Sequence, residues 1–250
     1  TVEFRNVSFQ YPGAANPTLH NISFTANKGE TVAFIGSTGS GKSTLINMIP
    51  RFYDATEGQV LVDGVDVREY TQQELNNKLG YVSQKAVLFS GTVAGNVAYG
   101  DSDGGPPSEE GIEQAIEIAP ASEFVGKMQG GISASISQGG ANVSGGQKQR
   151  LSIARAVYRK PEIFIFDDSF SALDYKTDRV LRSALKRQTG ETTSLIVAQC
   201  IGPIMDADKI IVLDQVEIVG EGRHKELLAT CDVYREIAQS QLSLEELENG

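Results

Sequence analysis

A glycine-rich loop between an apolar run and a helical pattern constrains the fold of this chain more than any other stretch. Residues 31–35 are typical of a buried strand, and residues 42–49 predict a helix. The loop consists of Gly36, Ser37, Thr38, Gly39, Ser40, Gly41, Lys42, Ser43 and Thr44. Its glycines allow successive backbone N–H groups to converge on one anion, which the positive end of the helix dipole also favours. Lys42 suits the outer phosphates and Ser43 suits Mg²⁺. A mere Gly/Ser-rich linker would not need strand, loop and helix in this register, so we expect a nucleoside triphosphate site.

The composition limits the class of protein. The 250 residues are 40% hydrophobic and carry 22 Lys and Arg against 32 Asp and Glu, a net charge of −10. This length is enough to bury the core of one domain. Duplex nucleic acid is not an expected partner, because phosphates require a basic surface. No apolar run approaches the roughly 20 residues of a transmembrane helix, and no secretory signal opens the chain. Because Cys200 and Cys231 also lack metal or redox spacing, we expect a soluble intracellular chain.

Short strands separated by turn signals dominate both ends of the chain. We expect a helix at 178–187 and strands at residues 2–9, 21–25, 31–35, 59–62, 163–166, 193–197 and 210–213. A helix-rich segment, 85–159, lies between them. It is interrupted by an Asp/Gly/Pro-rich loop at 101–107, and Pro120 ends a helical pattern at Ala119. Strands that alternate with helices predict a parallel sheet with helices on its faces. The acidic residues 244–250 predict a solvated helix end or a frayed tail.

A second apolar strand supplies a carboxylate. Residues 163–166 run directly into Asp167. A carboxylate at the end of a strand can hold Mg²⁺, directly or through water, opposite Ser43. A strand-terminal Asp is otherwise commonly a helix N-cap. After a phosphate-binding loop we expect it to be a metal ligand.

A third motif lies between the first two and runs straight into a helical pattern. It contains Ser144, Gly145, Gly146 and Gln147. A serine and two glycines at a helix N-terminus form a second anion site, whereas a Gly-Gly turn before a helix is the simpler alternative. With this motif the chain resembles the nucleotide-binding domain of an ATP-binding cassette (ABC) transporter over essentially all of its length. In that family the motif, called the signature, caps the γ-phosphate bound to a second cassette, and the resemblance implies ATP and Mg²⁺ as cofactors.

The resemblance also implies the fold. We expect an α/β protein of the P-loop NTPase (RecA-like) type, with a parallel-sheet core, an antiparallel β subdomain and an inserted α-helical subdomain. Residues 1–250 would form a single nucleotide-binding domain. Its ATP-binding core, with the N-terminal β subdomain, would comprise 1–84 and 160–250, and 85–159 would be the helical subdomain that carries the signature.

The resemblance also implies roles for single residues outside these motifs. Tyr11 matches an aromatic residue that stacks on adenine, although an isolated tyrosine is more often a core or surface residue. Gln84 matches a glutamine that contacts Mg²⁺ and senses the membrane domain, so the expected metal ligands are Ser43, Gln84 and Asp167. The loop expected to cross to the partner cassette consists of Ser171, Ala172, Leu173 and Asp174. Residues 51–58 and 89–99 are similar to exporter-type cassettes in particular.

Two departures fall on positions where the family performs catalysis. Asp168 stands where a glutamate polarises the attacking water, and it has the same charge with one methylene less reach. Gln199 stands where the family has a histidine, and an amide neither carries a positive charge nor relays a proton. His20 and His224 are not expected to replace that histidine. The expected catalytic residues are thus Lys42, Gln84, Asp168 and Gln199. We expect the site to bind ATP through residues such as Lys42 and to lose on the order of 10²- to 10⁴-fold in the chemical step.

The pairing of an intact signature with a weakened catalytic site resembles the degenerate half of a heterodimeric bacterial multidrug-type exporter. The implied partners are a second nucleotide-binding domain, of a different chain, and the exporter's transmembrane domain. The implied location is the cytoplasmic face of the plasma membrane. The loop at 134–140 lacks the acidic residues with which exporter cassettes contact the membrane domain, which removes the basis for those ionic contacts. Two further departures, at 200–203 and 214–217, have no functional account; the second lacks an expected glycine turn.

Other functions share part of this pattern. A non-hydrolytic regulatory ATP-binding module would keep every binding residue and differ only through Asp168 and Gln199. A soluble cassette ATPase acting on chromosomes would need long inserted coiled coils, and one acting on ribosomes pairs two cassettes in one chain. A P-loop kinase or GTPase would not explain the signature.

Overall fold

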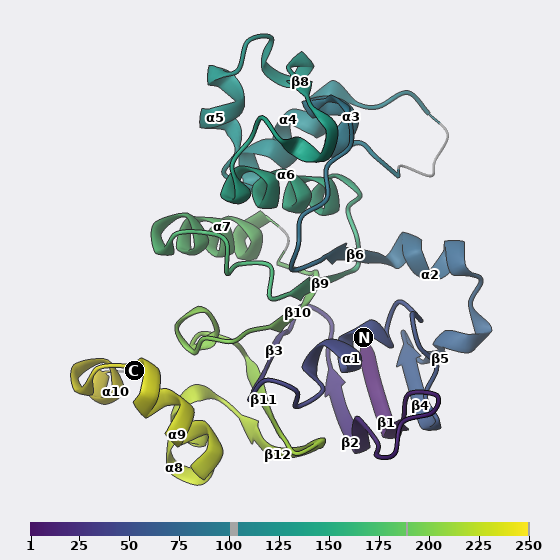
Figure 1. Ribbon diagram of the computed structural model, residues 1–250, viewed down its shortest axis with the longest axis vertical. Coiled ribbons are helices and arrows are strands. Elements are labelled where there is room, and N and C mark those ends of the chain that lie inside the picture. Colours follow the sequence, from purple (N-terminus) through teal and green to yellow (C-terminus); the bar gives the residue numbers. More distant parts are fainter. Residues whose placement is uncertain (101–104, 189, 250) are drawn as a thin grey trace. The chain divides into compact units, whose positions relative to one another are not determined.

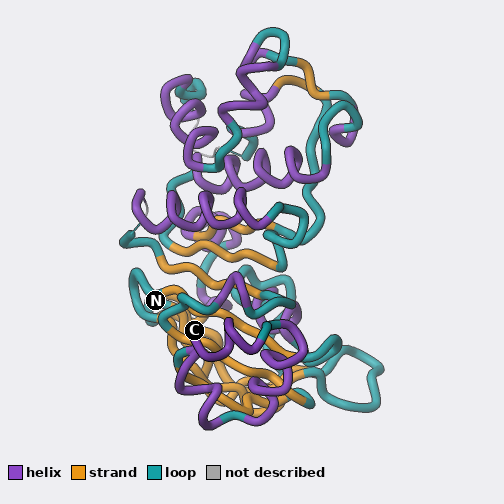
Figure 2. Tube along the Cα trace, turned by 90° about the vertical axis from the view of Figure 1, so that its left-hand side faces the viewer, coloured by secondary structure: helices purple, strands orange, loops and turns teal. Residues whose placement is uncertain are grey.

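A computed structural model describes residues 1–100, 105–188 and 190–249. The chain divides into two compact units, and each is described by itself below. The first unit comprises Thr1–Asn76 and Glu191–Gly250, and the second comprises Asn77–Gly190. Strands predominate in the first unit and helices in the second (Figure 2). The predicted helical subdomain at 85–159 has other limits than these units and stays a prediction.

An antiparallel sheet in the first unit is built from the N-terminal residues, and its strand order is β2-β1-β4-β5 (Figure 1). Its strands are β1 (Val2–Phe9), β2 (Leu19–Ala26), β4 (Glu57–Val62) and β5 (Val65–Asp66). In β1, Val2 and Phe4 are buried and so are Val7 and Phe9, and a register irregularity between Phe4 and Val7 shifts the alternation by one residue. This period of two is the pattern of a strand with one face against a core.

A parallel group of strands forms the second half of the first unit. Its order is β12-β11-β3-β10, from strands β3 (Thr31–Gly36), β10 (Thr193–Val197), β11 (Lys209–Asp214) and β12 (Glu217–Gly222). β3 runs parallel to both β10 and β11, and only β12 is antiparallel. Residues 32–35 of β3 are all fully buried, because a central parallel strand is covered on both faces.

The helices of the first unit are short. They are α1 (Lys42–Asn47), α8 (His224–Thr230), α9 (Asp232–Gln241) and α10 (Leu244–Asn249), and the division between the units falls inside α2 (Gln72–Lys78). Helix α1 ends two residues before the predicted limit, where Met48 and Ile49 donate to carbonyls three residues back. The acidic C-terminal residues are helical through Asn249. No helix in the described part of the chain is long and apolar enough to cross a membrane.

The second unit contains a parallel pair, β6 (Leu79–Val82) and β9 (Ile163–Asp167), and an antiparallel pair of two-residue strands, β7 (Gly91–Thr92) and β8 (Ser135–Ile136). Its helices are α3 (Val93–Val97), α4 (Glu109–Ile118), α5 (Ser122–Lys127), α6 (Gly145–Tyr158) and α7 (Tyr175–Gln188). Helix α6 is the centre of this unit, since α3 and α4 both pack on it and residues such as Leu151 and Ile153 are fully buried (Figure 1).

The expected P-loop NTPase architecture is confirmed, and so is the end of a helix before Pro120, since α4 stops at Ile118 and Ala119 is its C-cap. The short strands β5 to β8 and the edge strand β12 were not predicted. The loop predicted at 101–107 falls partly on residues 101–104, which lie outside the described residues.

The turn between β11 and β12 contains one of the sequence departures, the missing glycine at 214–217. Asp214 pairs with Glu217, so the turn has two central residues, Gln215 at φ 44° and Val216 at φ 69°. Two positive φ angles define a type I′ hairpin turn, which normally takes Asn-Gly. A β-branched residue is strained in this region. The turn is held where His20 N–H donates to the Val216 carbonyl, 2.9 Å away.

Val216→Gly is therefore expected to stabilise the chain. Glycine tolerates a positive φ, so the substitution should raise the free energy of unfolding by about 1 kcal/mol after its own chain-entropy cost. Urea unfolding measures this change. The matched control is Val219→Gly in β12, where no positive φ is relieved and a loss of stability is expected. Equal losses from both substitutions would contradict the strain at Val216.

A buried histidine–tyrosine pair joins α8 to α9 in the first unit. His224 Nδ1 and the Tyr234 hydroxyl are 2.6 Å apart, and both side chains are buried. Among the described residues, Nε2 of His224 has no hydrogen-bond partner. Burial lowers the pKa of His224, and the charge of Lys225 lowers it further. The imidazole is thus held neutral in the folded chain.

This pair predicts a loss of stability in mild acid. The unfolded chain binds a proton at His224 below about pH 6.5, before the folded chain does, so stability falls as the pH drops from that value toward the folded-state pKa. Urea unfolding at several pH values should give His224→Gln a pH slope smaller than wild type by up to about 1.4 kcal/mol per pH unit. An unchanged slope in His224→Gln would refute the assignment.

Candidate functional site

The glycine-rich loop leaves the carboxyl end of β3, the central parallel strand of the first unit. Gly36 lies against the Leu213 carbonyl of β11, so closely that a Cβ there would overlap it. Gly39 and Gly41 have φ of 82° and 97°, which only glycine adopts without strain. The loop glycines are thus required by the backbone, and the loop lies at the strand edge where ligands of open α/β sheets bind.

Lys42 folds back over this loop. Its Nζ donates to the carbonyls of Gly36, at 2.7 Å, and Ser37, at 2.9 Å, and to the Ser40 hydroxyl at 3.3 Å. Ser37, Thr38, Gly39 and Ser43 are exposed around it. The ammonium group therefore sits at the loop itself, beside accessible polar groups.

Tyr11 lies beside the same loop. Its hydroxyl is hydrogen-bonded to Thr44 Oγ1 at 2.8 Å. Its ring makes edge contacts with Phe9, at 4.8 Å between centroids, and Tyr53, at 5.2 Å. The structure thus brings Tyr11 to the P-loop within an aromatic cluster whose member Tyr53 sequence reasoning did not identify.

Gln199 follows β10 at the strand edge from which the loop emerges. Val197 pairs with Phe34 in β3, and Ala198 N–H donates to the Phe34 carbonyl at 3.1 Å. The Gln241 side chain of α9 then holds the turn. It donates to the Gln199 carbonyl at 2.9 Å and accepts from the Ile201 N–H at 2.8 Å. The Gln199 side chain is exposed, and Gln241 is a positioning residue that the sequence did not indicate.

The carboxylates of the second unit lie where β6 and β9 end side by side. Val82 pairs with Phe166, so the residues that follow each strand are neighbours. The Tyr81 hydroxyl donates to Asp167 at 3.4 Å. Burial and the charge of Asp167 raise the pKa of Tyr81, which therefore remains a hydrogen-bond donor.

Asp168 and Gln84 form a direct pair at these strand ends. Gln84 Nε2 donates to Asp168 Oδ2 at 3.0 Å. Asp168 has a φ of 49°, in the left-handed region, and its carbonyl accepts from the Ser171 hydroxyl at 3.0 Å. The two residues singled out from the sequence for catalysis in this unit thus contact each other.

The signature motif starts α6 with a reciprocal capping box. Ser144 Oγ accepts from the Gln147 N–H at 3.2 Å, and Gln147 Oε1 accepts from the Ser144 N–H at 3.0 Å. These bonds satisfy two backbone donors that a helix start would otherwise leave unpaired. Ser144 and Gly145 remain exposed. The start of the helix is therefore ordered and accessible.

The loop Ser171–Asp174 lies against this start. A Cβ on Gly146 would meet the Ala172 carbonyl at 3.3 Å, so glycine allows the close approach. Asp174 caps α7 by accepting from the Thr177 N–H at 2.9 Å and from its hydroxyl at 2.6 Å, which lowers the pKa of Asp174. Within the second unit, the structure thus brings together the signature and the predicted dimer loop.

Asn142 orders the segment before the signature. Its side chain accepts from the Ser137 N–H and hydroxyl, both at 2.9 Å, and donates to the Ser135 carbonyl at 2.8 Å. These bonds hold Ser135, Ser137 and Asn142 together in the segment that leads into the signature. The signal available in the sequence was a single asparagine just before the signature, which sequence reasoning did not use.

The oxygen ligands available in each unit suit magnesium. Ser43 offers a hydroxyl, and Asp167 and Gln84 offer a carboxylate and an amide oxygen, the hard donors that Mg²⁺ prefers. No group of three or more His, Cys, Asp or Glu within the described ranges could hold a metal by itself. In phosphate sites Mg²⁺ takes one or two carboxylates and completes its shell with phosphates and water.

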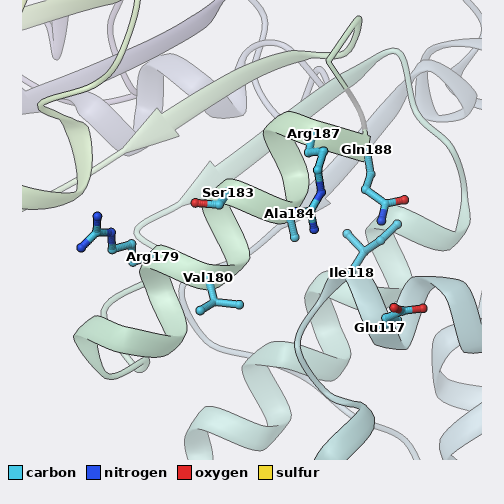
Figure 3. A pocket seen from close by; sticks show the side chains of 8 residues that line it. All are labelled: Glu117, Ile118, Arg179, Val180, Ser183, Ala184, Arg187 and Gln188. Atoms are coloured by element: carbon cyan, nitrogen blue, oxygen red, sulfur yellow. The ribbon is translucent and has the colours of Figure 1, made fainter.

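A separate hollow of about 340 Å³ lies between α4 and α7 (Figure 3). It is lined by Glu117, Ile118, Arg179, Val180, Ser183, Ala184, Arg187 and Gln188. None of the residues singled out from the sequence lines it. The hollow is therefore not the predicted nucleotide site.

Known proteins resemble this chain over nearly all of its length. A family profile described as "ABC transporter" matches residues 19–171. An uncharacterized ABC transporter ATP-binding protein of Mycobacterium tuberculosis is 48% identical over 240 residues, which cover 96% of this chain and 41% of that protein. The ATP-dependent lipid A-core flippase of Salmonella typhimurium is 44% identical, with the same coverage.

A solved structure of a bacterial Atm1-family ABC exporter with ATP bound matches with a TM-score of 0.90 and 36% identity. The match covers 97% of this chain and 42% of that one. The chain thus spans about two fifths of the length of the proteins it resembles. The profile, these relatives and the geometry of the phosphate loop agree, and the chain belongs to the ABC transporter family, as an ATP-binding domain of that family.

Proposed function

We propose that this chain is the ATP-binding motor domain of an ABC exporter and that its own catalytic site is degenerate. The observation that carries the proposal is the combination of a fully formed phosphate loop with a carboxylate, Asp168, that stands at the position of the family's glutamate, is shorter than it and is paired with Gln84. In this proposal ATP draws two cassettes together, and hydrolysis lets them separate, which drives transport across a membrane.

Each group of binding residues would contact a different part of Mg²⁺·ATP. The backbone N–H groups of Gly36 to Thr44 hold the phosphates, and Lys42 moves its ammonium from the loop carbonyls to the outer phosphates. Tyr11 presents its ring to adenine. Ser43, Gln84 and Asp167 would hold Mg²⁺, which supplies charge compensation for the phosphates when it is bound.

Two residues limit hydrolysis at this site. A general base must lie within hydrogen-bond distance of the water it activates, and Asp168 has one methylene less than the usual glutamate. Gln199 can donate a hydrogen bond to the γ-phosphate, but it stays neutral throughout. The site therefore binds ATP and hydrolyses it more slowly than a site with the family's glutamate and histidine would. The regulatory, non-hydrolytic module is the limiting case of this proposal.

The signature acts on a second cassette. Ser144 and Gly145 are exposed at the start of a 14-residue helix, where backbone N–H groups and the helix dipole favour an anion. Ser171, Ala172, Leu173 and Asp174 lie beside it and would reach the same partner. Because this chain's own catalytic residues are weakened and its signature is complete, the partner cassette is a different chain that supplies the active site.

An exposed aromatic surface is available to the transmembrane part of the exporter. Phe89 and Tyr99 stack at 4.5 Å and are 43% and 53% exposed, and Val87 beside them is 54% exposed. Arg155 of α6 donates to the Val87 carbonyl at 3.0 Å and lies over both rings. Apolar side chains held in this way mark an interaction site. The motor domain would work at the cytoplasmic face of the membrane, with residues 85–159 as its helical subdomain.

A cassette ATPase without a transport role remains the second candidate. The similarity to a flippase and an exporter favours transport. The net charge of −10 disfavours a nucleic-acid partner for either role.

Lys42→Ala should abolish tight ATP binding. The substitution removes the cation of the phosphate loop, and equilibrium titration with a fluorescent ATP analogue should show at least about a tenfold weaker affinity. Lys148→Ala, a lysine of the signature helix, is the control and should bind as wild type does. If the wild-type chain binds the ATP analogue no more tightly than Lys42→Ala does, the proposed function fails.

Asp168→Glu combined with Gln199→His should restore hydrolysis. The longer carboxylate reaches the water and the imidazole supplies the missing charge, so steady-state ATPase activity should rise by roughly 10²-fold or more. The same pair in a Lys42→Ala background controls for contaminating ATPase and should show no rise. A wild-type chain that already hydrolyses ATP at the rate of the double variant would disprove the degenerate site.

A further inference from the structure

The contact between Gln84 and Asp168 joins two residues that the family pattern treats as separate catalytic groups. The amide nitrogen of Gln84 donates to the Asp168 carboxylate at 3.0 Å. An amide has donors on one side and an acceptor on the other. Once its nitrogen is bound to Asp168, the orientation of the Gln84 carbonyl oxygen is set as well.

The backbone on both sides of this contact is fixed. Ser169 donates to the Val82 carbonyl at 2.6 Å, and both residues are buried. Gln149 of α6 is 1% exposed and donates to the Ser83 carbonyl at 3.2 Å. The chain is therefore anchored immediately before Gln84, at Ser83, and immediately after Asp168, at Ser169.

The side chain of Gln84 lacks a comparable support. It is exposed, and a long exposed side chain samples several rotamers unless a partner selects one. Asp168 supplies that partner from a backbone in the left-handed region, at φ 49°, where its carbonyl is also held by Ser171. The left-handed φ and the Ser171 hydrogen bond fix the Asp168 backbone, and from this backbone its carboxylate reaches the Gln84 amide.

We infer that Asp168 is a positioning residue that anchors Gln84, so that the amide oxygen of Gln84 would be available as a Mg²⁺ ligand, and that Asp168 acts through its hydrogen bond and not as the base for water. The inference rests on the proposed function, because it assigns Gln84 to Mg²⁺. It gives the shortened carboxylate a role of its own. The function of the Gln84–Asp168 pair is then to hold Mg²⁺·ATP.

Three residues at position 168 separate the two roles. Asp, Asn and Gly all tolerate a positive φ, so Asp168→Asn and Asp168→Gly leave the backbone conformation matched. Asparagine keeps an oxygen that accepts from Gln84 and removes the charge. Glycine removes both. If Asp168 acts as the hydrogen-bond partner of Gln84, its role survives in Asp168→Asn and is lost in Asp168→Gly. If Asp168 acts as a general base, its role is lost in both variants.

The first measurement uses the nucleotide-free chain labelled with ¹⁵N. The side-chain amide signals of Gln84 are assigned by their absence in Gln84→Ala. In wild type and Asp168→Asn they should be shifted from those of a free glutamine and exchange slowly with solvent. In Asp168→Gly they should move to the free position. Signals that do not respond to Asp168→Gly would overturn the anchor.

The second measurement is the Mg²⁺ dependence of fluorescent ATP binding. Asp168→Gly and Gln84→Ala should each weaken the apparent Mg²⁺ affinity by roughly 10-fold, as loss of a ligand's supporting partner does. The double variant should be no weaker than either single one, because both remove the same interaction. Gln114→Ala, an exposed glutamine of α4, is the control and should match wild type.

The outcomes separate this inference from the proposed function. If Asp168→Asn behaves like Asp168→Gly in both measurements, Asp168 acts through its charge and the inference is wrong. If additive losses are found, the two residues act independently and it is also wrong. If the wild-type chain binds no ATP, the proposed function fails, while the amide signals of Gln84 still decide whether the anchor exists.

Discussion

The central position of β3 is the constraint on which the first unit depends. Hydrogen bonds to β10 on one side and β11 on the other fix its register, and its buried residues leave no freedom to slide. The phosphate loop therefore leaves the sheet at one defined point, against the Leu213 carbonyl. This register also sets the positions of Lys42 and Gln199, because Lys42 lies in the loop that follows β3 and Gln199 follows β10, which pairs with β3.

Side-chain hydrogen bonds play the corresponding part in the second unit. The pairing of β6 with β9 brings two chain segments more than 80 residues apart to one edge, where Tyr81, Gln84 and Ser169 connect them. Gln149 links the same edge to the helix that the signature begins. A change at Asp168 can therefore alter how Gln84 is held, which is a different consequence from the loss of a base.

The fold class predicted from the sequence was confirmed, whereas several individual strands were not predicted. The roles of the phosphate loop, Asp167 and the signature stay predictions, which the sequence allowed because their chemistry requires particular residues at a fixed spacing. The strands β5 to β8 and β12 were missed, since several have only two or four residues and β12 lies at a sheet edge with a half-exposed pattern. Asn142, Gln149 and Gln241 were missed because a lone amide has no local signal, and its role comes from partners distant in the sequence or in a neighbouring loop.

The turn at Gln215 and Val216 could not be predicted from the sequence either. Its residues disfavour a positive φ, and only the pairing of β11 with β12 imposes that φ on them. By itself, the sequence determined that the chain is a P-loop ATP-binding domain of the ABC family with altered residues at 168 and 199, since these are matters of residue identity and spacing. Only the tertiary structure decided that Asp168 meets Gln84, because a hydrogen bond between residues 84 positions apart exists only once β6 and β9 lie side by side.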